Sequence, residues 1–123
     1  MMISDAEAVL MEALWRQSPR SSEELFAEVG PARGWQEGTV KSLLNRLLKK
    51  RAISAQRDGR RYLYTPRLAR EHYVMQQSTD LLDRLFGGRV APLVAHFSEH
   101  RKLGKKDIAE LKRLIRELDD DGD

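Results

Sequence analysis

Residues 35–50 read Trp35-Gln-Glu-Gly-Thr-Val-Lys-Ser-Leu-Leu-Asn-Arg-Leu-Leu-Lys-Lys50, a segment with one apolar side and one basic side. At helical spacing the aliphatic residues form a stripe that must face a core: Val40, Leu43, Leu44, Leu47 and Leu48. The opposite side carries cations and short hydrogen-bonding side chains: Thr39, Lys41, Ser42, Asn45, Arg46 and Lys49. Such a side suits the major groove of DNA, where cations meet phosphates and Asn or Arg contacts base edges. An ordinary solvated helix face fits this segment equally well.

The 123 residues carry a net charge of +3, and the charges are segregated along the chain. Residues 1–32 hold 2 Lys/Arg against 6 Asp/Glu, residues 33–70 hold 11 against 2, and residues 71–123 hold 9 against 11. A central window of +9 between acidic flanks indicates a surface for a polyanion. A basic helix lying on a membrane is a weaker alternative, because the apolar side of the central helix lacks Trp and Phe enrichment.

Composition excludes several classes of protein. The length allows one medium domain or a small domain with an appendage, and 41% hydrophobic residues predict a folded chain. No apolar run approaches the ~20 residues of a membrane span, and acidic residues interrupt any signal-like pattern at the N-terminus. The absence of cysteine excludes disulfides, thiolate metal sites and cysteine catalysis. We expect a soluble cytoplasmic protein without cofactor or metal, and no motif for an enzyme is present.

Two capping boxes predict the first two helices. Ser4 with Glu7 opens a helix that runs to about Gln17, and Ser21 with Glu24 opens a shorter one. A Gly- and Pro-containing loop at residues 30–34 then leads to the basic helix.

A β-hairpin is predicted after the basic helix. The extended segments are 53–57 and 61–65, and Asp58-Gly59-Arg60 between them is a hairpin signal. We expect Tyr62 and Tyr64 on one face and Leu63 and Ile53 on the other. Three helices followed by a basic hairpin is the order of a winged helix-turn-helix. The wing would carry Arg57, Arg60 and Arg61 to the DNA backbone or minor groove, although a plain solvated turn is the alternative.

The chain beyond Pro66 changes to helical patterns. We expect helices up to Gly87-Gly88, over 90–100 and over 107–118, followed by a fraying acidic tail, Asp119–Asp123. The predicted fold is therefore mainly α with a small hairpin: a winged-helix domain over 1–66 and a helical dimerisation domain over 67–123. These helices are too few to enclose a core, so a homodimer is expected. Its seam would use Leu81, Leu82, Leu85, Phe86, Leu93, Phe97, Ile108, Leu111, Leu114, Ile115 and Leu118.

Over nearly its whole length the chain resembles the BlaI/MecI/CopY, or penicillinase-repressor, family of bacterial repressors. Four segments carry the resemblance: Ile3–Glu7 with Leu14-Trp15, Trp35 with Thr39–Leu47, Gly59–Pro66, and a C-terminal set comprising Leu85–Gly88, Leu93–Phe97 and Leu103–Leu118. In order, they are similar to the family's opening helix, recognition helix, wing and dimerisation region.

This resemblance implies a homodimer that blocks transcription at an inverted repeat in double-stranded DNA. It implies that Thr39, Lys41, Ser42 and Arg46 approach bases and phosphates. In the antibiotic-responsive branch a membrane sensor with a zinc-protease domain leads to cleavage of the repressor, and the matching bond here lies near His96-Phe97. This chain departs from the staphylococcal pattern in having His96 where Asn would stand, and Gln36 where a capping Ser is frequent. The copper-responsive branch uses a cysteine-rich tail, which this chain lacks.

Other residues fit structural or binding roles. His96 and His100 have the spacing of a two-His metal site, but surface histidines without metal are the favoured interpretation. Trp15 and Trp35 are expected to pack in the core rather than stack on a base. Lys49-Lys50-Arg51 can touch phosphates or favour the helix C-terminus through its dipole. Two rival functions remain: a winged helix used for protein contacts alone, and an RNA-binding module, which has Tyr62 and Tyr64 as its only stacking residues.

Overall fold

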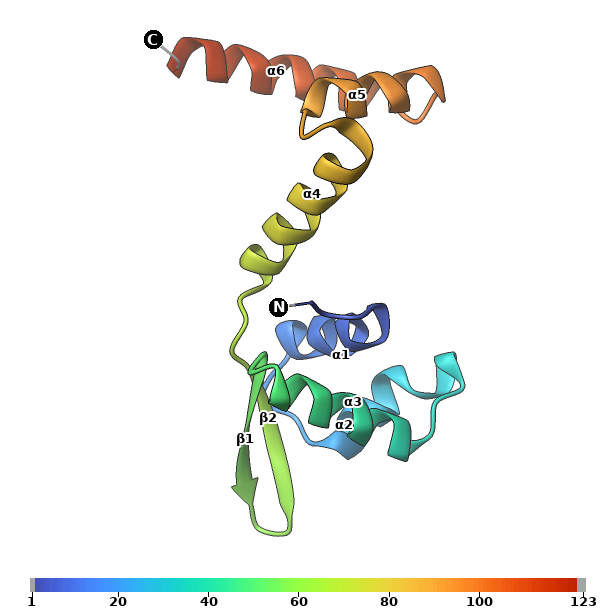
Figure 1. The fold of residues 1–123 in the computed structure, drawn as a ribbon, viewed down its shortest axis with the longest axis vertical. Helices are drawn as coiled ribbons and strands as arrows, with labels where there is room; N and C mark the ends of the chain where they lie inside the picture. Colours follow the sequence, from blue (N-terminus) through green and yellow to red (C-terminus); the bar gives the residue numbers. More distant parts are fainter. Residues whose placement is uncertain (1, 122–123) are drawn as a thin grey trace. The chain divides into compact units, whose positions relative to one another are not determined.

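The computed structural model describes residues 2–121, which divide into two compact units, one ending at Met75 and the other starting at Gln76. The elements, shown in Figure 1, are α1 (Asp5–Arg16), α2 (Ser22–Val29), the 3₁₀ helix η1 (Pro31–Arg33), α3 (Glu37–Lys49), β1 (Ile53–Asp58), β2 (Arg61–Pro66), α4 (Arg70–Phe86), α5 (Val90–Glu99) and α6 (Lys105–Asp121). The predicted fold class, mainly α with one antiparallel hairpin, is confirmed.

Both predicted capping boxes are present. The backbone N–H of Glu7 donates to Ser4 Oγ at 3.1 Å, while the Ser4 N–H donates to Glu7 Oε1 at 2.9 Å. The same reciprocal pair joins Ser21 and Glu24 at 3.2 and 3.1 Å. Each box satisfies backbone donors that would otherwise lack a partner at the helix start, so α1 and α2 begin where the sequence predicts.

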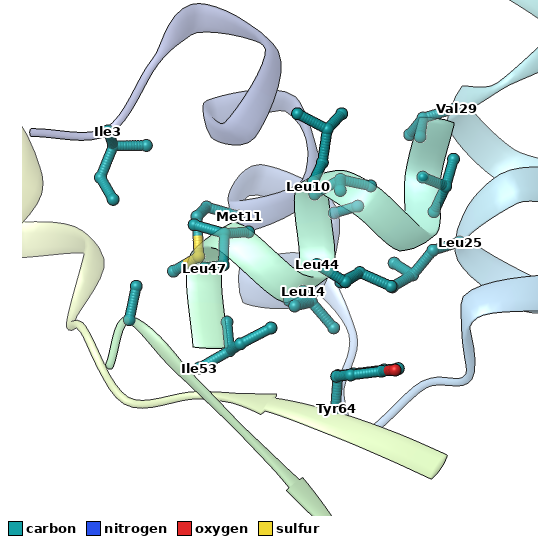
Figure 2. Close-up of a cluster of buried hydrophobic side chains, with 14 residues drawn as sticks. Ile3, Leu10, Met11, Leu14, Leu25, Val29, Leu44, Leu47, Ile53 and Tyr64 are labelled. Atoms are coloured by element: carbon teal, nitrogen blue, oxygen red, sulfur yellow. The ribbon is translucent and has the colours of Figure 1, made fainter. Parts of the chain in front are cut away.

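The core of the first unit lies where α1, α2 and α3 meet the hairpin (Figure 2). Leu10 and Leu14 from α1, Leu25 from α2 and Leu44 and Leu47 from α3 are each 0% exposed. The apolar stripe of α3 therefore faces the core as predicted, with Leu48 half-buried at its margin. Burying one such side chain stabilises the fold by roughly 1.5–3 kcal/mol.

The hairpin has a two-residue loop, Gly59-Arg60, because Asp58 pairs with Arg61. Gly59 has a φ of 65°, a conformation that glycine adopts without steric cost. The expected position of Ile53 is wrong. Ile53 pairs with Pro66, which shares a face with Tyr64, so Ile53 and Tyr64 enter the core together and Leu63 lies on the opposite face.

A single extended residue ties the hairpin to the segment between α1 and α2. Arg20 and Tyr64 form an antiparallel bridge, with N···O distances of 3.1 and 2.8 Å. This bridge fixes the wing beside the start of α2. The first unit thus has three helices and a hairpin arranged as a winged helix-turn-helix.

Trp15 anchors the segment that follows the hairpin. Its indole Nε1 donates to the Leu68 carbonyl at 2.8 Å, and its ring lies 5.5 Å from that of Tyr73, centroid to centroid. Both tryptophans pack against the core as expected, Trp35 from the loop before α3. The first turn of α4 therefore belongs to the first unit.

The second unit contains no buried side chain among its described residues. Positive φ angles at Gly87, Gly88 and Arg101 mark the breaks between its helices. The expected fraying of the acidic tail is wrong for Asp119–Asp121, which continue α6; the rest of that tail, residues 122 and 123, lies outside the described residues.

Candidate nucleic-acid interface

The outer side of α3 is the centre of the candidate site. Because Val40, Leu43, Leu44 and Leu47 are buried, helical geometry turns the intervening side chains outward. All six predicted contact residues on this helix side are exposed: Thr39, Lys41, Ser42, Asn45, Arg46 and Lys49. Burial of the aliphatic stripe fixes α3 in the fold, so the polar and cationic side chains are displayed at the surface on a rigid helix.

The start of α3 differs from those of α1 and α2. Gln36 is the N-cap residue and its side chain makes no capping hydrogen bond. Its carbonyl accepts from the backbone N–H groups of Thr39 and Val40 at 3.0 and 3.3 Å. The first turn of α3 therefore lacks the side-chain cap that Ser4 and Ser21 give to α1 and α2.

The wing carries its three predicted arginines on exposed positions. Arg57 Nε donates to the Gly59 carbonyl at 3.1 Å, and Arg61 pairs with Asp58 at 3.3 Å and with Glu24 at 3.8 Å. Exposed ion pairs of this kind are worth roughly 0–1 kcal/mol. The arginines can therefore exchange these contacts for phosphate at little cost.

A hollow of about 300 Å³ joins the start of α2, the outer side of α3 and the wing. Its lining combines predicted and unpredicted residues: Ser21, Ser22, Glu23, Lys41, Asn45, Arg60, Arg61, Tyr62 and Tyr64. Lys41, Arg60 and Arg61 give it a positive charge that the partial positive charge at the α2 N-terminus increases. Glu23 is the one acid in the lining. The hollow can hold one anionic group such as a phosphate.

Two members of this hollow, Ser22 and Tyr62, are not among the contact residues that the sequence predicts. Ser22 opens α2 and Tyr62 is 50% exposed, with a phenol that can donate to a phosphate oxygen. For Ser22 the available signal was the helix-turn-helix order, because this arrangement places the start of the second helix beside the third. Alternation along β2 was the other signal, since Tyr62 lies two pairs nearer the tip than buried Tyr64 and on the same face of the hairpin.

Lys50 lies apart from the other predicted contact residues. Its ammonium donates to Glu7 Oε1 at 2.6 Å and to the Met2 carbonyl at 2.8 Å. Burial raises the pKa of Glu7, but the hydrogen bonds from Lys50 and Ser4 outweigh it and hold that pKa below its usual value. Lys50 therefore joins the end of α3 to the start of α1, and its charge is engaged within the fold.

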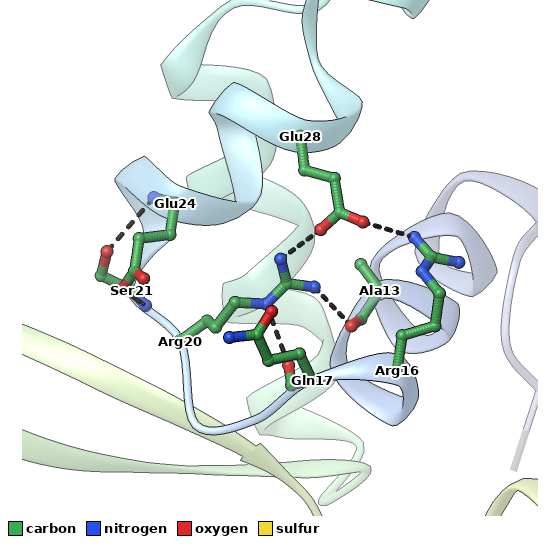
Figure 3. A network of polar contacts seen from close by, with 7 residues as sticks. All are labelled: Ala13, Arg16, Gln17, Arg20, Ser21, Glu24 and Glu28. Atoms are coloured by element: carbon green, nitrogen blue, oxygen red, sulfur yellow. Dashed lines mark hydrogen bonds and ion pairs between the residues drawn. The ribbon is translucent and has the colours of Figure 1, made fainter.

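A second polar network, shown in Figure 3, sets the angle between α1 and α2. Arg20 is only 7% exposed and donates to the carbonyls of Ala13 and Gln17 and to the Glu28 carboxylate. Arg16 reaches the same carboxylate at 2.9 Å. The hydrogen bonds from Arg16 and Arg20 lower the pKa of Glu28, so the carboxylate stays charged and bridges the two helices.

The predicted seam residues of the second unit remain accessible in the single chain. Phe97 is 41%, Ile115 57% and Leu118 70% exposed, and the remaining members are exposed or half-buried. His96 and Phe97, the candidate cleavage residues, are exposed on α5. The rings of His96 and His100 lie 4.6 Å apart, yet residues 2–121 contain no group of three or more ligands suited to a metal.

Within the described part of the chain, none of the helices combines the length and the apolar character that crossing a bilayer requires. The exposed apolar side chains of α6 (Lys105–Asp121) are interleaved with charged ones.

Comparison with known proteins agrees with this arrangement. The sequence model of the penicillinase repressor family matches residues 3–117. The penicillinase repressor of Bacillus licheniformis is 31% identical over 94% of this chain and 90% of its own; that of Staphylococcus aureus is 27% identical over 94% and 92%. Among solved structures, the monomeric form of Bacillus licheniformis BlaI in complex with the blaP half-operator aligns at a TM-score of 0.52 and 33% identity, over 59% of this chain and 89% of that one.

Proposed function

The chain belongs to the penicillinase repressor family, and from this premise we propose that it represses transcription by binding an inverted-repeat operator as a homodimer. The single observation that carries the proposal is the continuous surface of α3, the wing and the start of α2. Cations line this surface, and a hollow sized for a phosphate lies at its centre. The BlaI structure in complex with a half-operator supports the assignment of the first unit to DNA.

Each element of this surface has a distinct proposed role. Asn45 and Arg46, in the middle of the outer side of α3, would read base edges in the major groove, because their side chains form paired hydrogen bonds. Thr39, Lys41, Ser42 and Lys49 would contact bases or phosphates along the same side. Arg57, Arg60 and Arg61 would fix the wing on the backbone, and these contacts set position rather than sequence.

Lys50 is left out of this proposed contact surface. Its ammonium would have to leave Glu7, a carboxylate that is 1% exposed, in order to reach a phosphate. Leaving a buried charge without a partner is costly. Ser22 and Tyr62 are added in its place because they line the phosphate-sized hollow.

Dimerisation is proposed from the exposure of apolar side chains in the second unit. Its apolar side chains stay accessible in a single chain, and a second copy would cover them. Two first units held by such a dimer would present two α3 helices to successive turns of DNA, which requires half-sites about one helical turn or a multiple of it apart. The inverted repeat follows from the twofold symmetry.

We further propose that proteolysis within α5 relieves repression and that the regulated pathway is β-lactam resistance, as the family relationship suggests. The candidate bond joins His96 and Phe97, both exposed. A protease binds its substrate in an extended form, so α5 must unwind locally first. Cleavage would separate α6 from the rest of the chain and weaken the dimer. Intact-mass measurement of the repressor from cells treated with a β-lactam tests this step, and a full-length chain under induction contradicts it.

The DNA-binding proposal is tested by fluorescence anisotropy with duplex from the gene's own upstream region and with a scrambled duplex, across a salt series. Tight binding with a preference that survives added salt is the expected result. Arg46→Ala should weaken binding by roughly 1–3 kcal/mol and reduce discrimination at one base pair. Lys112→Ala, which removes one positive charge from the second unit, is the matched control and should retain the preference.

Other outcomes identify the rival functions. Equal and steeply salt-sensitive binding to both duplexes would mean that the protein is attracted to the DNA backbone without reading its sequence. Absence of binding to any duplex would favour a winged helix used for protein contacts. Preference for single strands would favour an RNA-binding module.

A further inference from the structure

Four of the five large aliphatic residues of α6 have the spacing of a narrow helix–helix seam, and the fifth, Leu114, is 45% exposed next to Ile115. Ile108, Leu111, Ile115 and Leu118 follow one another at intervals of three, four and three residues. This alternation is the a/d pattern of a two-stranded coiled coil. Ile108, Ile115 and Leu118 are 41%, 57% and 70% exposed, and Leu111 is half-buried. The seam is therefore open over most of its length in the single chain.

The charges of α6 are arranged against its own dipole. α6 opens with two cations, Lys105 and Lys106, and two more, Arg101 and Lys102, lie just before it, whereas residues 117–121 carry four acids and no cation. A helix prefers acids near its start and cations near its end. In the first turn Asp107 is the one acid, and the last turn has no basic residue. This arrangement has a cost in an isolated helix, and a neighbouring helix of opposite direction removes it.

We propose that α6 pairs with α6 of a second copy in antiparallel orientation, and that the two charged ends select this orientation. The antiparallel arrangement sets the basic start of each helix beside the acidic end of the other. A parallel arrangement sets cations beside cations and acids beside acids. The basic middle, with Lys112, Arg113 and Arg116, faces itself in both orientations and therefore does not discriminate. This inference rests on the homodimer of the proposed function and specifies its geometry.

The register follows from the symmetry of the seam. Its four residues are centred on Arg113, so Ile108 would face Leu118 of the partner subunit and Leu111 would face Ile115 of the partner subunit. A seam of two heptads is too short to hold a dimer alone. The exposed apolar side chains Leu81, Leu85 and Val90 of α4 and α5 would supply further contact. The α6 pair then determines how the two copies are oriented.

The absence of cysteine from the chain allows a direct test by disulfide trapping. The variants are Ile108→Cys and Leu118→Cys in the full chain, each alone and as a mixture combined under reducing conditions and then oxidised. A disulfide requires Cα atoms within about 7 Å. In the antiparallel register the two copies of residue 108 are separated by ten residues of helix, about 15 Å. Residues 108 and 118 of different copies are adjacent.

The expected result is a cross-linked dimer in the mixture and essentially none in either variant alone. Glu110→Cys, on the side of α6 away from the seam, is the matched control and should stay uncross-linked. Efficient cross-linking of Ile108→Cys with itself would establish a parallel pair and overturn the proposal. Absence of any disulfide, with light scattering still reporting a dimer, would overturn the α6 pair and leave the homodimer intact. A monomeric wild-type chain would overturn both.

Charge reversal tests the reason for the orientation. Lys105→Glu with Lys106→Glu turns both facing ends acidic in the antiparallel pair and should raise the dimer dissociation constant by roughly tenfold or more at low salt. Adding Asp119→Lys, Asp120→Lys and Asp121→Lys restores opposite charges and should restore the wild-type constant. In a parallel pair the first variant merely replaces one like-charged end with another. An unchanged dissociation constant would therefore contradict the proposal.

Discussion

The two units of the chain bury their apolar side chains in different ways. In the first unit, leucines from three helices, such as Leu14, Leu25 and Leu44, are removed completely from solvent by other parts of the same unit. In the second, no described side chain is buried, although its helices carry many aliphatic residues. The first unit thus has a core within one chain. The described part of the second unit has apolar surfaces but no buried core of its own.

This difference indicates what each unit needs in order to be stable. A segment of fewer than 50 residues buries too little surface to balance the entropy of ordering its chain. The second unit should therefore gain its stability from association, which depends on protein concentration. The first should be insensitive to concentration. The proposed DNA contact and the proposed dimer assembly should accordingly be separable, so that variants alter one without the other.

The largest effect is expected from opening a cavity in the first unit. Leu44→Ala should lower its free energy of unfolding by about 2–5 kcal/mol. Urea unfolding followed by tryptophan fluorescence is the measurement, because Trp15 and Trp35 both lie in this unit. Leu118→Ala, which truncates a side chain that is 70% exposed, is the control and should leave this transition unchanged. Equal effects of both changes would mean that the two units unfold together.

The next effect concerns association alone. Ile115→Asp places a charge on the open side of α6 and should convert the dimer to a monomer that binds one half-site weakly. Light scattering gives the mass, and the fluorescence transition of the first unit should keep its midpoint. Ala109→Asp, away from the seam, adds the same charge and should remain dimeric. A dimer that persists with Ile115→Asp would refute the placement of this residue in the interface.

A smaller effect is expected at the ion pair between Lys50 and Glu7, which joins two distant segments of the first unit. Lys50→Met leaves the Glu7 carboxylate buried without its cation and should cost about 1–3 kcal/mol. The pKa of Glu7 lies below its usual 4.5 in the folded chain, so its contribution is complete above that pH and is lost as the pH falls through the lowered folded value. Unfolding of wild type should therefore become easier below about pH 4.5.

Glu7→Gln separates this contribution from that of Glu28, whose pKa is also lowered. The variant should be less stable at neutral pH and show a shallower loss of stability on acidification. Urea midpoints at a series of pH values between neutral and acid give the comparison. Identical pH slopes for wild type and Glu7→Gln would show that Glu7 does not contribute to acid unfolding.

Local patterns predicted the helices because their signals lie within a few residues of one another. The capping boxes at Ser4 and Ser21 and the aliphatic stripe of α3 are of this kind. The face of Ile53 was wrong because it depends on hairpin register, which the loop Gly59-Arg60 sets. The partner of Lys50 is 43 residues away, and nothing in the local pattern identifies it.

The residues of the candidate site also differ in whether a local sequence pattern predicts them. The exposed residues of α3 follow from the helix period alone. The hollow that brings Ser22 and Tyr62 to Lys41 exists only because the Arg20–Tyr64 bridge fixes the wing beside α2. The acidic end of α6 was misjudged for another reason: a run of aspartates disfavours the end of a helix, yet here the helix continues to Asp121.

The smallest effect distinguishes α3 from the other helices of the first unit. Gln36→Ser should provide the side-chain cap that Ser4 and Ser21 provide at α1 and α2, and should raise the stability of the first unit by about 0.5–1 kcal/mol. The fluorescence transition measures this gain, with Gln36→Ala as the control that adds no acceptor. The gain is limited because Thr39 stands where a capping box would have Glu or Gln. If both variants shift the midpoint equally, the effect arises from losing Gln36 rather than from a new cap.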